Sequence, residues 1–280
     1  MEFVVADGQT PHRDCSTLVL PALSIGNVGQ LSIDLMIASV KAERIGYLDD
    51  PSVLPCVGND AYGPVAVGEL ALPLEVYESV DHGLSLIQQR SPVIKGMMVE
   101  YAKNLADFAA SSGKKHLIVL SGLDSGRRKR IDESSDTQVY YLSSSNVDGT
   151  EGRCEKLRWK MLQGYDPNQR RWKYLESLAE GNSGQEDFDD ELTLTDDDYY
   201  PGLPFAALFS SCKAKGLTVT SILYYCSEGD NIPDSFKLAE AAYKYLGICP
   251  TKFGDNKDIG WCIPLSWKTV YGPPPNMSMF

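Results

Sequence analysis

Short apolar runs alternate with helical patterns along this chain, and this alternation constrains the fold more than any other feature. Residues 17–25 (TLVLPALSI) form an apolar run that is typical of a buried strand. A helical pattern follows over residues 27–40. The succession returns later, with helices predicted over 95–112, 206–215 and 233–246 and strands over 116–122 and 217–226. Strands that alternate with helices form a sheet with helices packed on its faces, so we predict an α/β fold.

Further strand patterns indicate that the sheet is mixed. They cover residues 44–48, 72–78 and 84–90. A strand-rich stretch of this kind favours a mixed sheet over a purely parallel one. We therefore predict a central mixed β-sheet flanked by α-helices. Residues 151–180 are basic and carry a pattern that predicts a helical segment.

A block of acidic residues interrupts the ordered patterns. Residues 180–198 contain nine acidic and no basic side chains. Such a block repels itself and buries little apolar surface, so we predict a disordered insertion, with a docking segment for a basic partner as the alternative. We expect one α/β domain over residues 1–272, interrupted by this insertion. Residues 273–280 are proline-rich and predict an extended tail.

Charge and hydropathy exclude some classes of partner. The formal net charge of −12 over 280 residues argues against a nucleic-acid binder, which usually carries a basic face. The sequence contains no apolar run near the roughly 20 residues of a membrane span, so we expect no membrane partner. Basic patches on proteins remain the expected partners of so acidic a chain.

Cysteine use and the amino-terminal sequence predict the compartment. The chain has seven cysteines, an odd number, and no C-x-x-C pair. This pattern argues against a disulfide framework or a zinc site and for a reducing compartment. The first ten residues, MEFVVADGQT, lack the basic start and long apolar core of a signal peptide. We therefore expect a cytoplasmic and nuclear location.

The segment SEGDNIPD, residues 227–234, concentrates carboxylates at the end of a predicted strand. Catalysis or metal binding is one interpretation of Glu228, Asp230 and Asp234. The other interpretation is structural, because most of the segment suits a turn that starts a helix. These residues are Gly229 for a positive φ, Asp230 and Asn231 for an Asx turn, Pro233 for the first helical turn and Asp234 near the helix N-terminus. We favour the structural interpretation, which leaves only Glu228 without a local role.

The segment GNVGQ, residues 26–30, raises a similar question. Glycines between a strand and a helix can hold a phosphate, but the segment fits neither dinucleotide nor P-loop spacing. A tight turn at Gly26 and a capping box formed by Asn27 and Gln30 explain it, and Gly29 belongs to the same turn.

Nucleophile patterns are also missing from the sequence. The three histidines share no motif, and His12 lies near a terminus that we expect to be loose. SGLDSG, residues 121–126, lacks the G-x-S-x-G pattern. We therefore predict no catalytic residues, no metal ligands and no cofactor.

Several segments resemble the α/β family of proteasome assembly chaperones. They are PALSIGNVGQLSIDLMI (21–37), GYLDD (46–50), PCVGNDAY (55–62), LIQQRSPVIK (86–95), LIVLSG (117–122), SEGDNIPDSFKLAE (227–240) and IPLSW (263–267). The resemblance implies a non-enzymatic chaperone that forms a heterodimer with proteasome assembly chaperone 1. Such a pair is expected to bind α-subunits of the 20S proteasome, to promote α-ring formation and to prevent incorrect ring association.

The carboxyl end departs from a signal of that family. Some chaperones of this type end in a hydrophobic residue, a tyrosine and any residue, which enter pockets between α-subunits. This chain ends in Ser278, Met279 and Phe280, so methionine stands in the place of tyrosine. Met279 and Phe280 are retained as candidate partner contacts.

Two other functional classes stay open. One is an enzyme that processes nucleotides or nucleosides, or a ligand-binding protein, on a similar α/β scaffold. A ligand bound beside residues 26–29 or 228–230 would favour that class. The other is a scaffold protein that docks its partners through the acidic insertion. Deletion of residues 180–198 distinguishes this scaffold from a chaperone that works through its folded surface.

Overall fold

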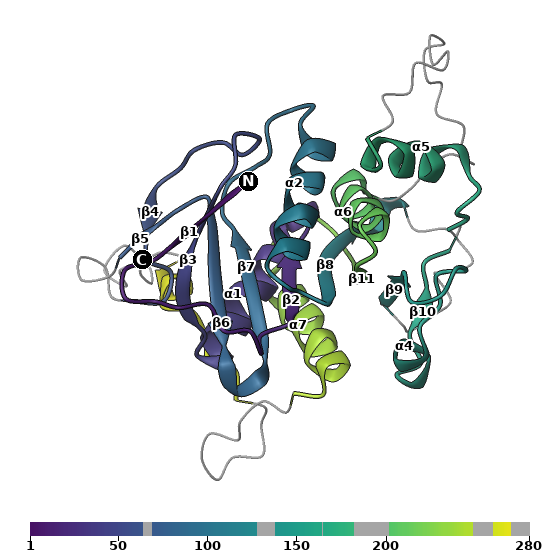
Figure 1. Ribbon diagram of the computed structural model, residues 1–280. Helices are drawn as coiled ribbons and strands as arrows, with labels where there is room; N and C mark the ends of the chain where they lie inside the picture. The colour runs from purple at the N-terminus through teal and green to yellow at the C-terminus, as the bar shows by residue number, and fades with distance from the viewer. Residues whose placement is uncertain (64–68, 128–137, 164, 182–201, 249–259, 270–280) are drawn as a thin grey trace, which may run out of the picture.

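The computed structural model describes residues 1–63, 69–127, 138–163, 165–181, 202–248 and 260–269 (Figure 1). In these residues, nine strands form one sheet in the order β1-β3-β6-β7-β2-β8-β11-β9-β10. Their bounds are β1 Glu2–Val5, β2 Thr17–Pro21, β3 Glu43–Asp49, β6 Leu74–Ser79, β7 Leu84–Gln89, β8 His116–Asp124, β9 Val139–Ser143, β10 Lys160–Met161 and β11 Thr218–Cys226. A separate short pair joins β4 (Gly58–Asn59) to β5 (Leu70–Ala71).

The sheet is mixed, as the sequence predicts. β7, β2, β8 and β11 are parallel neighbours at its centre. On one side β6, β3 and β1 continue the sheet as antiparallel strands. On the other side β9 pairs antiparallel with β11, and β10 pairs parallel with β9. The central strands therefore place their carboxyl ends along one edge of the sheet.

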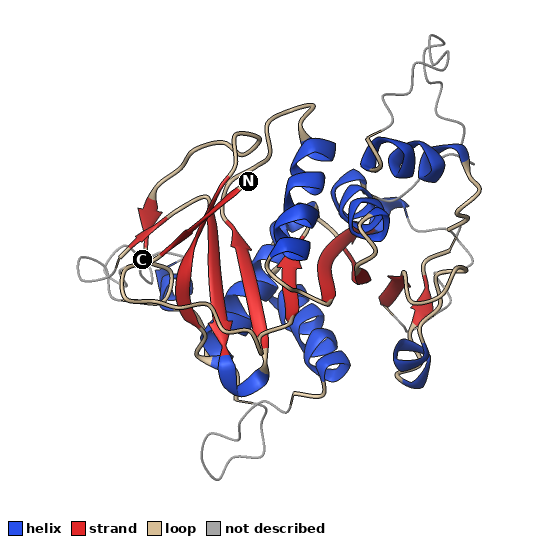
Figure 2. Ribbon diagram, viewed as in Figure 1, coloured by secondary structure: helices blue, strands red, loops and turns tan. Residues whose placement is uncertain are grey.

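Helices cover both faces of the central strands, which makes a three-layer α/β/α arrangement (Figure 2). α1 (Val28–Val40) and α7 (Ile232–Leu246) lie on one face. α2 (Met98–Ser111), α5 (Arg170–Ala179) and α6 (Leu203–Ala214) lie on the other. Short 3-10 segments occur at Ile25–Asn27, Val80–His82, Ser125–Arg127 and Leu265–Thr269.

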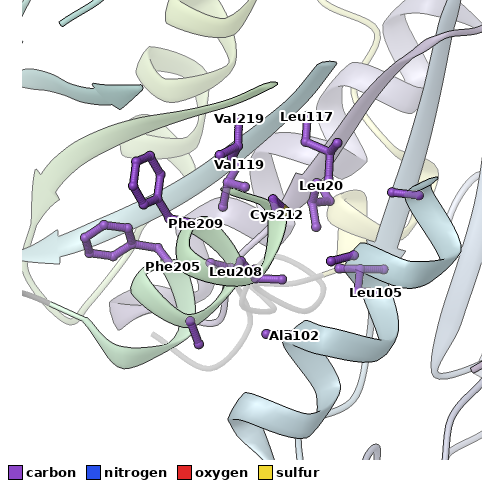
Figure 3. Packing of buried hydrophobic residues seen from close by; sticks show 14 of the residues in the cluster. Leu20, Ala102, Leu105, Leu117, Val119, Phe205, Leu208, Phe209, Cys212 and Val219 are labelled. Carbon is purple, nitrogen blue, oxygen red and sulfur yellow. The ribbon is translucent and has the colours of Figure 1, made fainter. Parts of the chain in front are cut away.

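Alternate side chains of each central strand enter different cores. In β8, Leu117 and Val119 pack with α2 and α6, as Figure 3 shows, whereas Ile118 and Leu120 belong to the core under α1 and α7. All four side chains are fully buried. Burial on both faces explains why the sequence of this strand is almost continuously apolar.

The predicted helical segment over residues 151–180 is correct only in part, because the helix is interrupted. The structure has a short helix, α4 (Gly152–Lys156), then β10, and only then α5. Arg158 takes φ of 58°, in the left-handed region, so α4 cannot continue through it. The chain then turns back to add β10 to the edge of the sheet.

The amino-terminal segment is not loose, which corrects a second prediction. β1 pairs with β3 along its whole length. The backbone N–H of His12 donates to Glu78 Oε2 at 2.8 Å, which fixes the chain that follows β1. Neither β1 nor β9 was predicted from the sequence.

Several predicted features lie outside the described residues. The acidic insertion does so from residue 182 onward, and the tail over residues 273–280 does so entirely. The expectation of one domain over residues 1–272 stays a prediction. Among the residues that the structure describes, no helix combines the length and apolar character needed to cross a bilayer.

Truncation of a central strand residue should strongly destabilise the protein. Leu120 in β8 is fully buried, so Leu120→Ala removes apolar contacts and leaves a cavity. We expect the free energy of unfolding to fall by about 2–5 kcal/mol, measured by urea denaturation followed by circular dichroism. Val147→Ala is the control, because Val147 is 85% exposed and should change stability by less than about 0.5 kcal/mol. Equal midpoints for the two variants would contradict the assignment of the core.

Candidate functional site

Two segments that are far apart in the sequence meet at the carboxyl ends of the parallel strands. The first turn, residues 26–30, leads from β2 into α1, and the second turn, residues 227–234, leads from β11 into α7. Gly26 and Asn231 form the closest approach. A Cβ atom built on Gly26 would lie 2.1 Å from Asn231 Oδ1, and Gly26 itself has φ of 61°. Only glycine fits this position without displacing the second turn.

The second turn is held together by its own polar side chains. Asp230 Oδ1 accepts a hydrogen bond from the N–H of Ile232 at 3.2 Å, which makes an Asx turn. Asn231 Nδ2 donates to Ser227 O at 2.8 Å and to Asp234 Oδ2 at 2.9 Å. Pro233 and Asp234 lie in the first turn of α7, and Gly229 has φ of 149°. Asp230, Asn231 and Asp234 therefore build the turn and the start of the helix.

The first turn packs directly on the sheet, and the helix that follows it contacts α7. A Cβ atom on Gly29 would lie 2.5 Å from Leu120 O, so α1 begins in close contact with the backbone of β8. One turn later, Ser32 Oγ lies 2.7 Å from Val28 O and 3.0 Å from Ser235 O. Gly29 therefore sets the distance of α1 from β8, and Ser32 links α1 to α7.

The predicted capping box is wrong. Asn27 does precede α1, but its side chain makes no capping hydrogen bond. Asn27 has φ of 49° and ψ of 28°, whereas a capping side chain needs an extended backbone to reach the helix N–H groups. Gln30 contributes through its backbone instead, since Gln88 Nε2 donates to Gln30 O at 2.8 Å.

The chemistry available at the two turns is limited. The Asn231 side chain occupies the space next to Gly26. Glu228 is exposed at the surface of the second turn. Across the described ranges, no group of three or more histidine, cysteine, aspartate or glutamate side chains is arranged to hold a metal ion. The two turns therefore join structural elements and present Glu228 to the outside.

Residues 18–250, which include both turns, match the sequence model of the PAC2 family. The chain belongs to the PAC2 family. This membership confirms the resemblance that the sequence motifs indicate.

Relatives and a solved structure agree with this assignment. A protein of Nematostella vectensis named proteasome assembly chaperone 2 is 35% identical over 79% of this chain and 85% of its own length. A protein of Danio rerio with the same name is 30% identical over 96% of each chain. The crystal structure of Pyrococcus furiosus PbaA, described as an archaeal homologue of proteasome-assembly chaperone, shares the fold. Its TM-score is 0.57 at 17% identity, over 88% of this chain and 86% of PbaA.

A partly buried charge cluster in this PAC2-family chain was missed by sequence reasoning. Arg90 Nε lies 2.6 Å from Glu75 Oε2, and Arg90 Nη2 lies 3.1 Å from Asp34 Oδ1. Tyr62 donates its hydroxyl to Asp34 Oδ1 at 2.6 Å, and Arg44 Nη1 pairs with Glu75 Oε1 at 2.9 Å. The cluster joins α1, β3, β6, the end of β7 and the loop around Tyr62. The signal in the sequence that could have revealed this cluster is the presence of charged residues within apolar strand patterns.

The pKa values in this cluster follow from burial and charge. Burial and the nearby Asp34 carboxylate raise the pKa of Tyr62 well above its usual value. Burial disfavours the charged form of Arg90, but Asp34 and Glu75 outweigh that effect and raise the pKa of Arg90. Tyr62 therefore stays a neutral donor and Arg90 a cation. These states suit a structural link between α1 and the sheet.

The described cysteines behave as small apolar residues or exposed thiols. Cys15, Cys56, Cys154, Cys212, Cys226 and Cys262 are free. Burial raises the pKa of Cys212 and of Cys226 to about 12, so both remain thiols at neutral pH. A nucleophilic cysteine needs the opposite shift.

Substitution of Gly26 should separate the two turns. Gly26→Ala adds a Cβ that overlaps Asn231 Oδ1, whereas Gly96→Ala meets no atom within 4 Å, although Gly96 also has a positive φ of 87°. Both variants lose stability from the unfavourable φ, and we expect Gly26→Ala to lose about 1–3 kcal/mol more, measured by urea denaturation. The double variant with Asn231→Ala should recover part of this excess. Equal losses for the two glycine variants would contradict the close approach.

Proposed function

We propose that this chain is a non-enzymatic assembly chaperone for the 20S proteasome. In this proposal it forms a heterodimer with proteasome assembly chaperone 1 and binds α-subunits and α-ring intermediates. The pair promotes α-ring formation, prevents incorrect ring association and leaves when the particle matures. The proposed location is the cytoplasm and the nucleus.

The observation that carries this proposal is the extent of the similarity to named relatives. The Danio rerio relative covers 96% of this chain and is itself covered to 96%, so the whole fold is shared and not only one segment. Both turns fall inside the region that defines the family. A function that depends on the folded surface is therefore supported over the chain as a whole.

The geometry at the strand ends supports a non-enzymatic role. General acid–base catalysis needs a titratable group aimed at a space where a substrate fits. In the second turn, the carboxylates of Asp230 and Asp234 accept hydrogen bonds from Ile232 and Asn231 within the turn itself. The Asn231 side chain occupies the space where a Cβ on Gly26 would lie. These groups are committed to the fold, which favours a binding protein over an enzyme.

The physical task of such a chaperone is to occupy a surface for a limited time. An unfinished α-ring exposes apolar and charged surfaces that can pair incorrectly. A folded heterodimer covers part of that surface until later assembly steps change it. The net charge of −12 favours encounter with basic patches on α-subunits, because opposite charges steer association.

Affinity purification from cells tests the proposal directly. We expect a tagged full-length chain to recover proteasome assembly chaperone 1 and free 20S α-subunits, identified by mass spectrometry. Mature proteasomes, followed through their β-subunits and peptidase activity, should be absent because the chaperone leaves before maturation. Recovery of mature particles, or of neither α-subunits nor the sister chaperone, contradicts the proposal. A tagged protein of similar size and acidity serves as the control for charge-driven capture.

The carboxyl end supplies a separate test of the mechanism. Met279 and Phe280 lie outside the described residues, and their role as partner contacts stays a prediction. If they enter a pocket between α-subunits, deletion of residues 276–280 should weaken α-ring binding at least tenfold in a titration with purified α-rings. The comparison is a chain of full length whose last five residues are replaced by Gly and Ser. Unchanged affinity in the deletion variant removes the tail from the mechanism.

A further inference from the structure

β1 leaves one edge of the nine-stranded sheet open. It is one of the two terminal strands, and among the described residues it pairs with β3 alone. Figure 1 shows β1 and the β4–β5 pair on the side of the molecule opposite α4 and α5. Val4 and Val5 are 48% and 41% exposed, although most terminal strands are protected by charge, proline or a covering element. An exposed, apolar edge strand is a template for pairing with another strand.

The backbone groups of this edge can be assigned from the ladder. The N–H of Ala6 donates to Ile45 O at 2.9 Å, so Ala6 bonds toward the sheet. Because inward and outward bonding alternate along an antiparallel strand, Glu2 and Val4 also bond toward β3. The N–H and C=O groups of Phe3 and Val5 therefore point away from the sheet, where an added strand would meet them.

One face of this edge combines apolar and acidic side chains. We call it the β1 edge face, and it consists of Glu2, Val4, Tyr47 and Asp49. Its residues are cross-strand partners, with Glu2 opposite Asp49 and Val4 opposite Tyr47. Residues that lie opposite each other in a ladder point to the same side of the sheet. α1 packs on β2, β7 and β8, and in the sheet order β1 stands three strands from β7.

A cleft opens beside the β1 edge face, and Leu48 and Val53 of the α2-side core also line it. It has a volume of about 320 Å³, and its lining includes Val4, Tyr47, Asp49, Pro55, Leu72 and Pro73. A cleft of this size accommodates one or two aliphatic side chains from a partner. Its walls come from β1, β3 and the chain on either side of the β4–β5 pair, so it is built by ordered elements of the fold.

The acidic pair indicates the charge of the partner. Glu2 and Asp49 are both exposed and stand directly opposite each other. Neither carboxylate forms an ion pair with another described residue. The N-terminal ammonium group lies 3.7 Å from Oδ2 of the neighbouring Asp50 instead. Like charges directly opposite each other in a ladder are unfavourable. A lysine or arginine placed between the two carboxylates would remove this repulsion.

We propose that the β1 edge takes up an extended strand from a protein partner, and that this strand carries a basic and an aliphatic residue two positions apart. The backbone of the added strand bonds to Phe3 and Val5. Its basic side chain lies beside Glu2 and Asp49, and its aliphatic side chain lies beside Val4 and enters the cleft. The spacing of two follows from the side-chain period of a strand. The inference rests on the proposed function only for the partner's identity, a 20S α-subunit.

Strand peptides and a charge exchange test this inference on the full-length chain. The probe is the labelled peptide Thr-Val-Thr-Lys-Thr-Val-Thr. Its matched control is Thr-Val-Thr-Glu-Thr-Val-Thr. Binding is followed by fluorescence anisotropy at low ionic strength. We expect the natural chain to bind the Lys peptide at least tenfold more tightly than the Glu peptide. Protection of the Val5 amide against hydrogen exchange should accompany binding.

Two variants with equal net charge separate the β1 edge from a general charge effect. E2K/D49K should reverse the preference and bind the Glu peptide more tightly. D81K/E155K is the matched control, because Asp81 and Glu155 are exposed on other elements, and it should retain the preference of the natural chain. Absence of Lys-peptide binding at millimolar concentration, or the same preference in both variants, overturns the inference.

Capture of purified α-subunits with the same variants connects the edge to the proposed function. We expect E2K/D49K to capture at least tenfold less α-subunit than the natural chain. D81K/E155K should capture as much as the natural chain. Equal capture by both variants overturns the assignment of this edge to α-subunits but leaves the proposed function intact. If the natural chain captures no α-subunit yet shows the peptide preference, the proposed function fails and the strand-binding edge stands. A gain in peptide affinity after removal of residues 270–280 would instead identify the chain's own tail as the occupant.

Discussion

The four parallel strands at the centre of the sheet must be covered on both faces, and the rest of the structure depends on that constraint. β7, β2, β8 and β11 carry apolar side chains that point in both directions. Burial of such a strand on each side is the main source of stability for a fold of this kind. Helices α1 and α7 supply one cover, and α2, α5 and α6 supply the other. The crossovers that bring these helices back also align the carboxyl ends of the strands at one edge.

Alignment of those ends brings the two short turns into contact. Gly26 meets Asn231, and Gly29 meets the backbone of β8 at Leu120, so two helices begin within van der Waals contact of the sheet and of each other. Side chains larger than hydrogen have no room there. Asn231 Nδ2 donates to Ser227 and Asp234, Asp230 accepts from Ile232, and Glu228 is left at the surface. In other α/β proteins this edge often binds ligands; in this chain the space beside Gly26 and Gly29 is taken up by Asn231 and by the backbone of β8.

The strands at the periphery of the sheet are held in place differently from the central strands. Beyond β7 the strands are antiparallel, and charged clusters connect them to the helices. Arg90 links Asp34 on α1 to Glu75 on β6, while Lys114 Nζ lies 3.4 Å from Glu78 Oε1 and 2.8 Å from Cys15 O. Glu75 and Glu78 are buried and paired in these clusters, so the clusters fix the position of the flanking strands without enlarging the apolar core. β1, a terminal strand of the sheet, has an open edge. The proposed binding of a partner strand takes place at this edge.

The sequence by itself determined the α/β class, the mixed sheet, most of the central strands and helices, and the family. Local signals suffice for these features, because hydrophobic period and turn residues act over a few positions. Only the tertiary structure decided the role of Asn27, whose left-handed backbone prevents side-chain capping, and the break of the 151–180 helix at Arg158. It also decided the contact of Gly26 with Asn231, the partly buried cluster around Arg90 and the pairing of β1. The last three depend on residues brought together from distant parts of the chain, and no local pattern encodes the distance between them.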